Sequence, residues 1–297
     1  MSDTAIAVVL ALAAGLSYAG AAVLQQSVAA QQPRELSLSP RLIVELAKRP
    51  IWLLGIVVDI GAYVFEAAAL GFGSVVVVAP LLVSGLLFAI PLATVGTGQP
   101  VTRREMIPAV MVTAGLAAFV VVGEPSGGGS SASGLAWAVA GGVVAILAGT
   151  ALLLGRRPGT PPNHRALMYG LATGVLYGLT AVLTKATVDL VGDGVLQVLG
   201  DWQLYALLTV SIAALILNQS AFQAGHVGAS LPVIAVANPV VSCTLGVVLF
   251  GETLGAQQPV ELVVTVAAIV LMALGTIGLA RSPLVVHSAE HVPALEV

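Results

Sequence analysis

Charged side chains are scarce in this sequence: Asp, Glu, Lys and Arg make up only 8% of its 297 residues. An ordinary soluble domain carries about 25%. Hydrophobic residues make up 58% of the chain, so too few polar groups are present to cover a surface in water. This composition excludes a soluble globular enzyme and an intrinsically disordered chain.

Basic residues are not in excess, and cysteine is almost absent. The 11 Lys and Arg residues are outnumbered by 14 Asp and Glu residues, which excludes a nucleic-acid-binding protein. The single cysteine, Cys243, permits no internal disulfide and no cysteine-rich metal site. The sequence also contains no P-loop that would bind a nucleoside triphosphate. We therefore expect a polytopic all-α membrane protein without a cofactor.

Nine apolar segments are long enough to cross a bilayer, whose ~30 Å hydrocarbon core needs about 20 helical residues. They span roughly 5–28, 51–71, 74–97, 105–123, 134–155, 166–190, 202–223, 229–251 and 260–281. The first segment is preceded only by Asp3 and is too long for the apolar region of a signal peptide. The sequence thus predicts nine transmembrane helices, the first of them retained.

The basic residues predict how these helices are oriented. Ten of the 11 fall in odd-numbered loops or just after the ninth span, and none falls before the first span or in an even-numbered loop. They are Arg34, Arg41, Lys48, Arg49, Arg103, Arg104, Arg156, Arg157, Arg165 and Arg281. Because Lys and Arg collect on the cytoplasmic side, we expect the N-terminus outside and the tail at 282–297 in the cytoplasm. The predicted location is the plasma (inner) membrane.

The chain also repeats itself at an offset of 159 residues. This offset brings Tyr18 onto Tyr177, Pro80 onto Pro239, and the Gln-Pro-Val tripeptide at 99–101 onto 258–260. We therefore predict one transmembrane domain at 1–281, with one repeat at about 5–123 and a second at about 166–281. The helix at about 134–155 connects them, so helices 1–4 match helices 6–9.

The first repeat begins outside and the second begins inside, so the two repeats are inverted. Inverted repeats are a construction of secondary transporters, whose substrate sites lie near the midplane between the repeats. Duplicated bundles also occur as channels or assembly subunits, and these alternatives stay open.

Three features carry a resemblance to a known family: the repeat, the Gly- and Pro-rich spans, and the ending Leu249-Phe250-Gly251-Glu252 of the eighth span. In these features the chain resembles the drug/metabolite transporter superfamily (EamA-like). Nine rather than ten spans, a basic loop after the first span, and prolines within spans 3 and 8 make the chain most similar to the NIPA-type magnesium-transporter branch. The resemblance implies a secondary transporter, but the substrate does not carry over from the superfamily or from the NIPA branch. The tenth helix of typical superfamily members is missing here.

Two carboxylates lie within the second span, where ionisable side chains are costly and indicate function. Asp59 is about 14 Å from the predicted cytoplasmic end, and Glu66 is seven residues further along the same helix face, with Tyr63 between them. This set suits a hydrated cation or a proton relay, so Asp59 and Glu66 are also candidate metal ligands. The alternatives are a structural hydrogen bond for Asp59 and an approach to the outer headgroups for Glu66.

Lys185, in the sixth span, is the third ionisable residue. Asp189 lies one turn later and could pair with it near the outer interface. Gly170, Gly174 and Gly178 form a stripe of small residues on the same face as Lys185, and such stripes face other helices. An inward-facing Lys185 would repel cations, pair with a carboxylate, or bind an anionic substrate.

Uncharged polar residues occur at related positions of the two repeats. Span 7 holds Asn218, Gln219 and Gln223, and Tyr18 and Tyr177 occupy equivalent positions in spans 1 and 6. Asn238 precedes Pro239 in span 8; Pro239 and its counterpart Pro80 in span 3 are expected to kink their helices. Each residue alone could be a contact between helices, but together they predict a polar central cavity.

The C-terminal sequence His287-Ser288-Ala289-Glu290-His291 matches a zinc-peptidase pattern, but it lies in a short tail beside Pro293. We reject catalysis and predict a protein that is not an enzyme. The expected function is secondary transport of a small polar solute or ion by alternating access. The alternatives are a NIPA-like magnesium or divalent-cation transporter and a non-transporting membrane assembly or lipid-handling protein. The expected partners are the substrate and the bilayer, and a homodimer is compatible with the glycine stripe.

Overall fold

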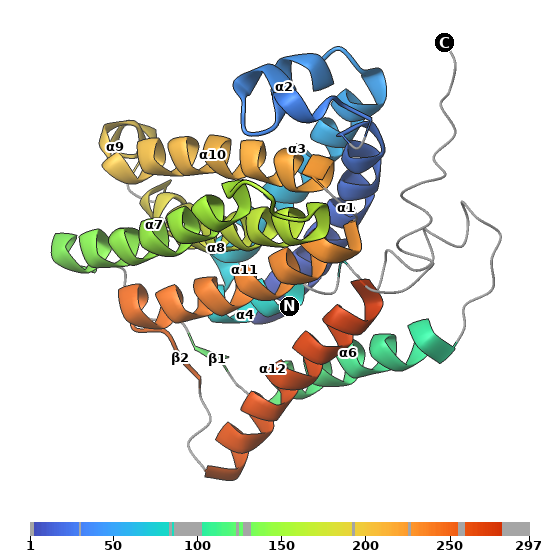
Figure 1. Ribbon diagram of the computed structural model, residues 1–297. Coiled ribbons are helices and arrows are strands. Elements are labelled where there is room, and N and C mark those ends of the chain that lie inside the picture. Colours follow the sequence, from blue (N-terminus) through green and yellow to red (C-terminus); the bar gives the residue numbers. More distant parts are fainter. Residues whose placement is uncertain are drawn as a thin grey trace.

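The computed structural model describes residues 3–29, 31–82, 85, 103–122, 125–126, 132–191, 194–224, 227–254 and 259–280. This part of the chain contains eleven α-helices, a short 3-10 helix and one pair of two-residue strands (Figure 1). The helices are α1 (Asp3–Ala29), α2 (Pro40–Leu46), α3 (Pro50–Phe72), α4 (Val75–Leu82), α6 (Arg103–Val122), α7 (Gly134–Arg156), α8 (Pro162–Val191), α9 (Val195–Gly200), α10 (Trp202–Ala224), α11 (Val227–Phe250) and α12 (Pro259–Ala280).

Six helices are long and apolar enough to cross a membrane: α1, α3, α7, α8, α10 and the Val233–Phe250 part of α11. The protein is therefore an all-helical, multi-pass membrane protein, as the composition predicts. Three further helices, α4, α6 and α12, begin within a few residues of the remaining predicted spans. Within the predicted span at 74–97, residues 83–84 and 86–97 lie outside the described part of the chain.

The longest helix, α8, forms the centre of the bundle and contacts α3, α7, α10 and α11. Its stripe of Gly170, Gly174 and Gly178 faces α11, which confirms the prediction that the stripe faces another helix. A Cβ atom at Gly174 would lie 3.0 Å from the carbonyl oxygen of Ile234, and one at Gly178 would lie 2.6 Å from the Cβ of Val241. The missing side chains thus let the two backbones approach closely.

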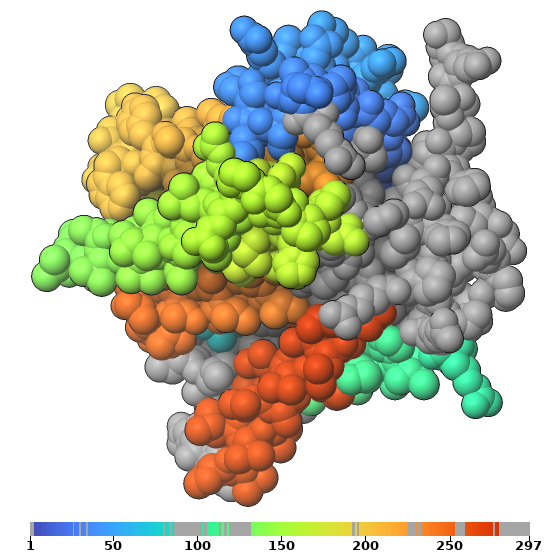
Figure 2. Space-filling view, viewed as in Figure 1, coloured from blue at the N-terminus to red at the C-terminus, as the bar shows by residue number. Residues whose placement is uncertain are grey.

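Helices α6 and α12 pack against each other as a pair beside this bundle (Figure 1). Glycines again permit the contact, since a Cβ atom at Gly115 would lie 2.7 Å from the carbonyl oxygen of Ala268. The space-filling view shows α7, in green, and α12, in red, crossing one face of the molecule (Figure 2). Leu135, Ile146 and Leu153 of α7 are exposed, which suits a surface in contact with lipid.

Loop contacts at the two ends of the bundle agree with the predicted alternation of the helices. Strand β1 (Pro125–Ser126), after α6, pairs antiparallel with β2 (Thr253–Leu254), after α11. In the loop between α1 and α3, the Leu38 amide donates a hydrogen bond to the Ser220 hydroxyl near the end of α10, at 2.9 Å. The first contact joins two loops predicted outside, and the second joins a predicted cytoplasmic loop to the predicted cytoplasmic end of α10.

Candidate functional site: a central cavity

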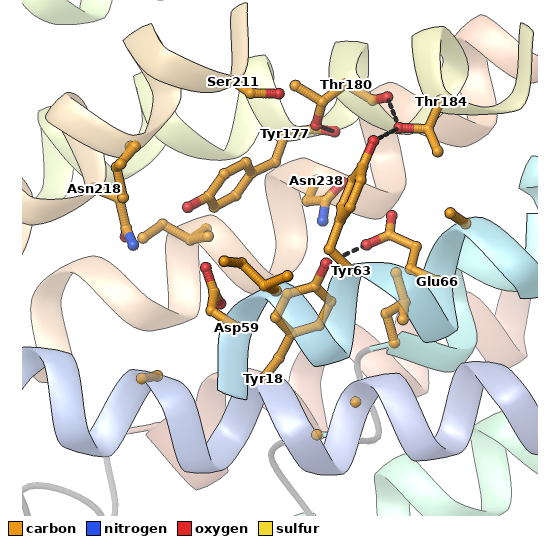
Figure 3. A pocket seen from close by; sticks show the side chains of 18 of the residues that line it. Tyr18, Asp59, Tyr63, Glu66, Tyr177, Thr180, Thr184, Ser211, Asn218 and Asn238 are labelled. Atoms are coloured by element: carbon orange, nitrogen blue, oxygen red, sulfur yellow. Dashed lines mark hydrogen bonds between the residues drawn. The ribbon is translucent and has the colours of Figure 1, made fainter. Parts of the chain in front are cut away.

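A cavity of about 750 Å³ lies between α1, α3, α4, α8, α10 and α11. Its walls are mainly alanine, valine, leucine and isoleucine side chains. Twelve polar residues also line it: Gln25, Thr187 and the ten labelled in Figure 3, which are Tyr18, Asp59, Tyr63, Glu66, Tyr177, Thr180, Thr184, Ser211, Asn218 and Asn238. The cavity has the size and composition of a small-molecule site: an apolar pocket with a few polar groups.

Helix α3 supplies three of these polar residues because their spacing places them on one face. Glu66 is 8% exposed, and its Oε2 accepts a hydrogen bond from the Tyr18 hydroxyl of α1 at 2.5 Å. The Tyr63 hydroxyl is hydrogen-bonded to the Thr184 hydroxyl of α8 at 2.7 Å. One end of the cavity is therefore a hydrogen-bonded network that ties α1, α3 and α8 together.

Asp59 lies toward the other end of the cavity, on the same side of the view as Asn218 and Tyr177 (Figure 3). These three side chains come from α3, α10 and α8. Asn218 is only 9% exposed, and neither its amide nor the Tyr177 hydroxyl has a hydrogen-bond partner within the described part of the chain. This end of the cavity thus presents polar groups that the surrounding protein leaves open.

The Asn238-Pro239 pair of α11 also lines the cavity. The Oδ1 atom of Asn238 is buried without a hydrogen-bond partner among the described residues. Pro239 has no amide hydrogen, so the carbonyl oxygen of Ala235, another lining residue, lacks its usual intrahelical donor. Pro80 lies within α4, whose neighbouring Ala79 and Leu82 line the cavity.

Three of the predicted substrate or coupling residues, Gln219, Gln223 and Lys185, are not among the described residues that line the cavity. The Gln219 amide donates to Gln25 at 2.6 Å and accepts from the Trp52 indole at 3.4 Å. The Gln223 amide donates to the carbonyl oxygen of Pro33. Both glutamines therefore hold α10 to α1, to α3 and to the loop after α1.

Lys185 pairs with Asp189, as the sequence allowed. Its Nζ lies 2.8 Å from Asp189 Oδ1, and the two side chains are 18% and 30% exposed. Lys185 is not among the described residues that line the cavity. Its positive charge is therefore compensated on its own helix and does not face the carboxylates of α3.

A carboxylate that the sequence indicated only as part of the ending of span 8 joins the end of α11 to the start of α4. Glu252 follows α11, is 1% exposed, and accepts hydrogen bonds from the Val75 and Val76 amides at 2.9 Å each. It thereby caps the N-terminus of α4. Gly246 makes room for it, because a Cβ atom there would lie 2.6 Å from Glu252 Oε2.

The described residues contain no group of three or more His, Cys, Asp or Glu side chains that could hold a metal ion. Asp59 and Glu66 are seven residues apart, which separates them by about 10 Å along the axis of α3. In Figure 3 the two carboxylates lie on opposite sides of the Tyr18 ring. A magnesium ion here would therefore keep most of its water ligands, as magnesium commonly does.

Comparisons with known proteins identify one relative. The chain is 31% identical over 286 residues to an uncharacterized protein of Corynebacterium glutamicum, and the match covers 95% of this chain and 97% of the relative. No family model matches the chain, and no solved structure matches it. A match of this identity over nearly both full lengths shows common descent.

Proposed function

We propose that this chain, which belongs to the same protein family as the uncharacterized Corynebacterium glutamicum protein, is a secondary transporter. It moves a small polar solute or ion across the plasma membrane by alternating access, with its N-terminus outside and its C-terminus in the cytoplasm. The observation that carries the proposal is the cavity of about 750 Å³, which lies between six helices and is lined by two carboxylates. Ionisable groups buried in a membrane protein mark substrate or ion pathways.

The packing of the helices supports an inverted repeat of nine spans. If α1, α3, α4 and α6 correspond to α8, α10, α11 and α12, the contact of α1 with α3 has its counterpart in that of α8 with α10. The contact of α1 with α4 likewise corresponds to that of α8 with α11, and α3 with α8 corresponds to α10 with α1. The cavity then lies between the halves, where such transporters bind their substrates.

In this proposal the carboxylates of Asp59 and Glu66 bind or couple the transported species. The substrate is found first, from the rise in melting temperature of the purified protein with a panel of metabolites and ions. Uptake of the stabilising compound into proteoliposomes then tests transport. We expect Asp59→Asn and Glu66→Gln to abolish uptake while Asp201→Asn, outside the cavity, retains it. Full uptake by both cavity variants would refute the assigned roles.

A magnesium or other divalent-cation transporter is the second candidate, because Asp59, Tyr63, Glu66 and Asn238 offer oxygen ligands to the cavity. Magnesium should then raise the melting temperature of the native protein and not that of the Asp59→Asn variant. A non-transporting assembly or lipid-handling protein would show no solute-dependent stabilisation and would keep its cellular function in the Asp59→Ala variant.

A further inference from the structure

We propose that the solute recognised by this cavity is a small organic cation whose ammonium group binds at the end formed by Asp59, Asn218 and Tyr177. This inference rests on the proposed transport function and names the substrate class of the same site. It is carried by hydrogen-bonding groups that the protein leaves open and by the sign of the charges around them.

The open polar atoms of the cavity include acceptors that need a donor. The Asn218 side chain, which is nine-tenths buried and lines the cavity, has no hydrogen-bond partner within the described part of the chain. A buried acceptor without a partner loses its hydrogen bonds to water and gains nothing in return. An ammonium group brings three N–H donors, which the Asp59 carboxylate, an asparagine carbonyl and the Tyr177 hydroxyl oxygen can accept.

The charges that line the cavity have one sign. Asp59 and Glu66 are carboxylic acids, and no Lys, Arg or His occurs among the described residues of the lining. Lys185 is 2.8 Å from Asp189 and faces elsewhere. In a low-dielectric interior a carboxylate attracts a cation and repels an anion strongly, so an anionic solute is disfavoured.

The two carboxylates are not equivalent, and this points to Asp59 as the partner of the ammonium group. Glu66 already accepts a hydrogen bond from the Tyr18 hydroxyl at 2.5 Å. Asp59 instead lies on the side of Asn218 and Tyr177, where open groups gather (Figure 3). Within the described residues the Asp59 carboxyl has Gln25 as its side-chain hydrogen-bond partner, while the Asn218 amide and the Tyr177 hydroxyl on the same side have none, so this end offers a ligand more open groups than the Glu66 end does.

The walls indicate that the cation is organic. Ile56 and Ile60 of α3 and Leu207 of α10 line the cavity close in sequence to the polar groups. A hydrated inorganic ion gains nothing from such walls, whereas a hydrocarbon portion next to an ammonium group is removed from water by them. The volume of about 750 Å³ also far exceeds the space of one metal ion.

Calorimetric titration of the purified full-length protein with three probes of equal chain length tests the inference. The probes are butylammonium, butanol and butyrate, which differ in the charge of one end. We expect butylammonium to bind at least about tenfold more tightly than butanol, because the pair with Asp59 is charge-assisted, and butyrate to bind weakest. Butanol or butyrate binding as tightly as butylammonium would overturn the inference.

Two variants and one control assign the effect to this end of the cavity. In Asp59→Asn the preference for butylammonium over butanol should disappear, and in Asn218→Leu, which keeps the charge, it should fall severalfold. Asp201→Asn is the same substitution outside the cavity and should bind as the native protein does. If Asp59→Asn does not fold, Asn218→Leu decides, and an undiminished preference there counts against the inference.

Proteoliposome uptake separates this inference from the proposed function. Selective butylammonium binding with no uptake of any compound that binds would leave the ammonium site standing and refute transport. Uptake of a neutral or anionic solute that is unaffected by Asp59→Asn would leave transport standing and refute the ammonium site. Uptake of an amine that requires Asp59 would support both.

Discussion

The cap that Glu252 places on α4 leads to a quantitative prediction for the substitution Glu252→Ala. The side chain is 1% exposed, and its two oxygens accept the amides of Val75 and Val76 at 2.9 Å each. Both amides are the first of α4 and have no partner within their own helix. Alanine would remove both acceptors from a place that water does not reach.

The cost follows from these two hydrogen bonds. A hydrogen bond to a charged group contributes about 1.5 kcal/mol at the low end of its range, so the loss of two should lower the free energy of unfolding by about 3 kcal/mol. Glu252→Gln keeps one carbonyl oxygen and should lose about half as much. Glu45 provides the control, since its side chain is 42% exposed and pairs only with the exposed Lys48. Glu45→Gln should change stability by less than about 0.5 kcal/mol.

Thermal unfolding of the purified protein in detergent measures the difference. With a shift of roughly 2 °C per kcal/mol for a chain of this size, Glu252→Ala should melt about 6 °C below the native protein. A melting temperature that falls from the native protein to Glu252→Gln and again to Glu252→Ala would show that the hydrogen bonds cause the loss of stability. A melting temperature for Glu252→Ala within about 1 °C of the Glu45→Gln control would refute the cap.

Three further predictions follow from the same structure. Burial raises the pKa of the Glu252 carboxyl more than the Val75 and Val76 amides and the nearby Lys185 lower it, with Asp189 adding to the rise. The folded protein then holds this proton more tightly than the unfolded chain, so the contribution of Glu252 to stability should be largest below about pH 4.3 and should be lost as the pH rises through the raised value. Melting temperatures recorded against pH should show a smaller fall in Glu252→Gln. Gly174→Ala should lower the free energy of unfolding by about 1–3 kcal/mol, because its Cβ would lie 2.8 Å from that of Ala237, whereas Gly149→Ala has open space and should be neutral or stabilising in the same melting assay. Tyr18→Phe removes the hydrogen bond to Glu66, so it should lower uptake in proteoliposomes with a loss of only about 1–2 kcal/mol in stability; uptake equal to that of the native protein would remove Tyr18 from the site.

The helices themselves could be predicted because a bilayer fixes both their length and their composition. The segments expected at 134–155 and 202–223 are found as α7 (Gly134–Arg156) and α10 (Trp202–Ala224). The stripe of glycines in α8 likewise predicted a close helix contact. The identity of the facing helix, α11, could not be read from the stripe, because small residues permit close approach without selecting a partner.

The polar lining of the cavity could also be predicted in part. Asp59, Tyr63 and Glu66 were expected on one helix face from their spacing, and the structure places all three in the cavity. Thr180 and Thr184 were missed, since a threonine within a span usually bonds to its own backbone; Thr184 does so with the carbonyl of Thr180, yet it also binds Tyr63.

The remaining differences arise from contacts between segments far apart in the chain. Gln219 follows Asn218 directly, but one residue turns a helix by about 100°, so its amide meets Gln25 and Trp52 instead of the cavity. Glu252 lies after a span, where a carboxylate ordinarily faces water or headgroups. Its real partners are 176 and 177 residues away, and only the folded chain reveals them.

The contacts at the two ends of the cavity bear directly on the proposed mechanism. At the predicted outer end, Glu252, which follows α11, binds the first amides of α4. At the predicted cytoplasmic end, Gln223 of α10 binds the Pro33 carbonyl in the loop after α1, and Ser220 binds the amide of Leu38. Both sets of hydrogen bonds cross between the predicted repeats, and the Glu252 bonds lie beside a cluster of buried apolar side chains that includes Val75 of α4 and Leu249 of α11. Alternating access requires that the contacts at one end of the cavity break while those at the other end stay formed. Substrate binding can offset the free-energy cost of breaking them.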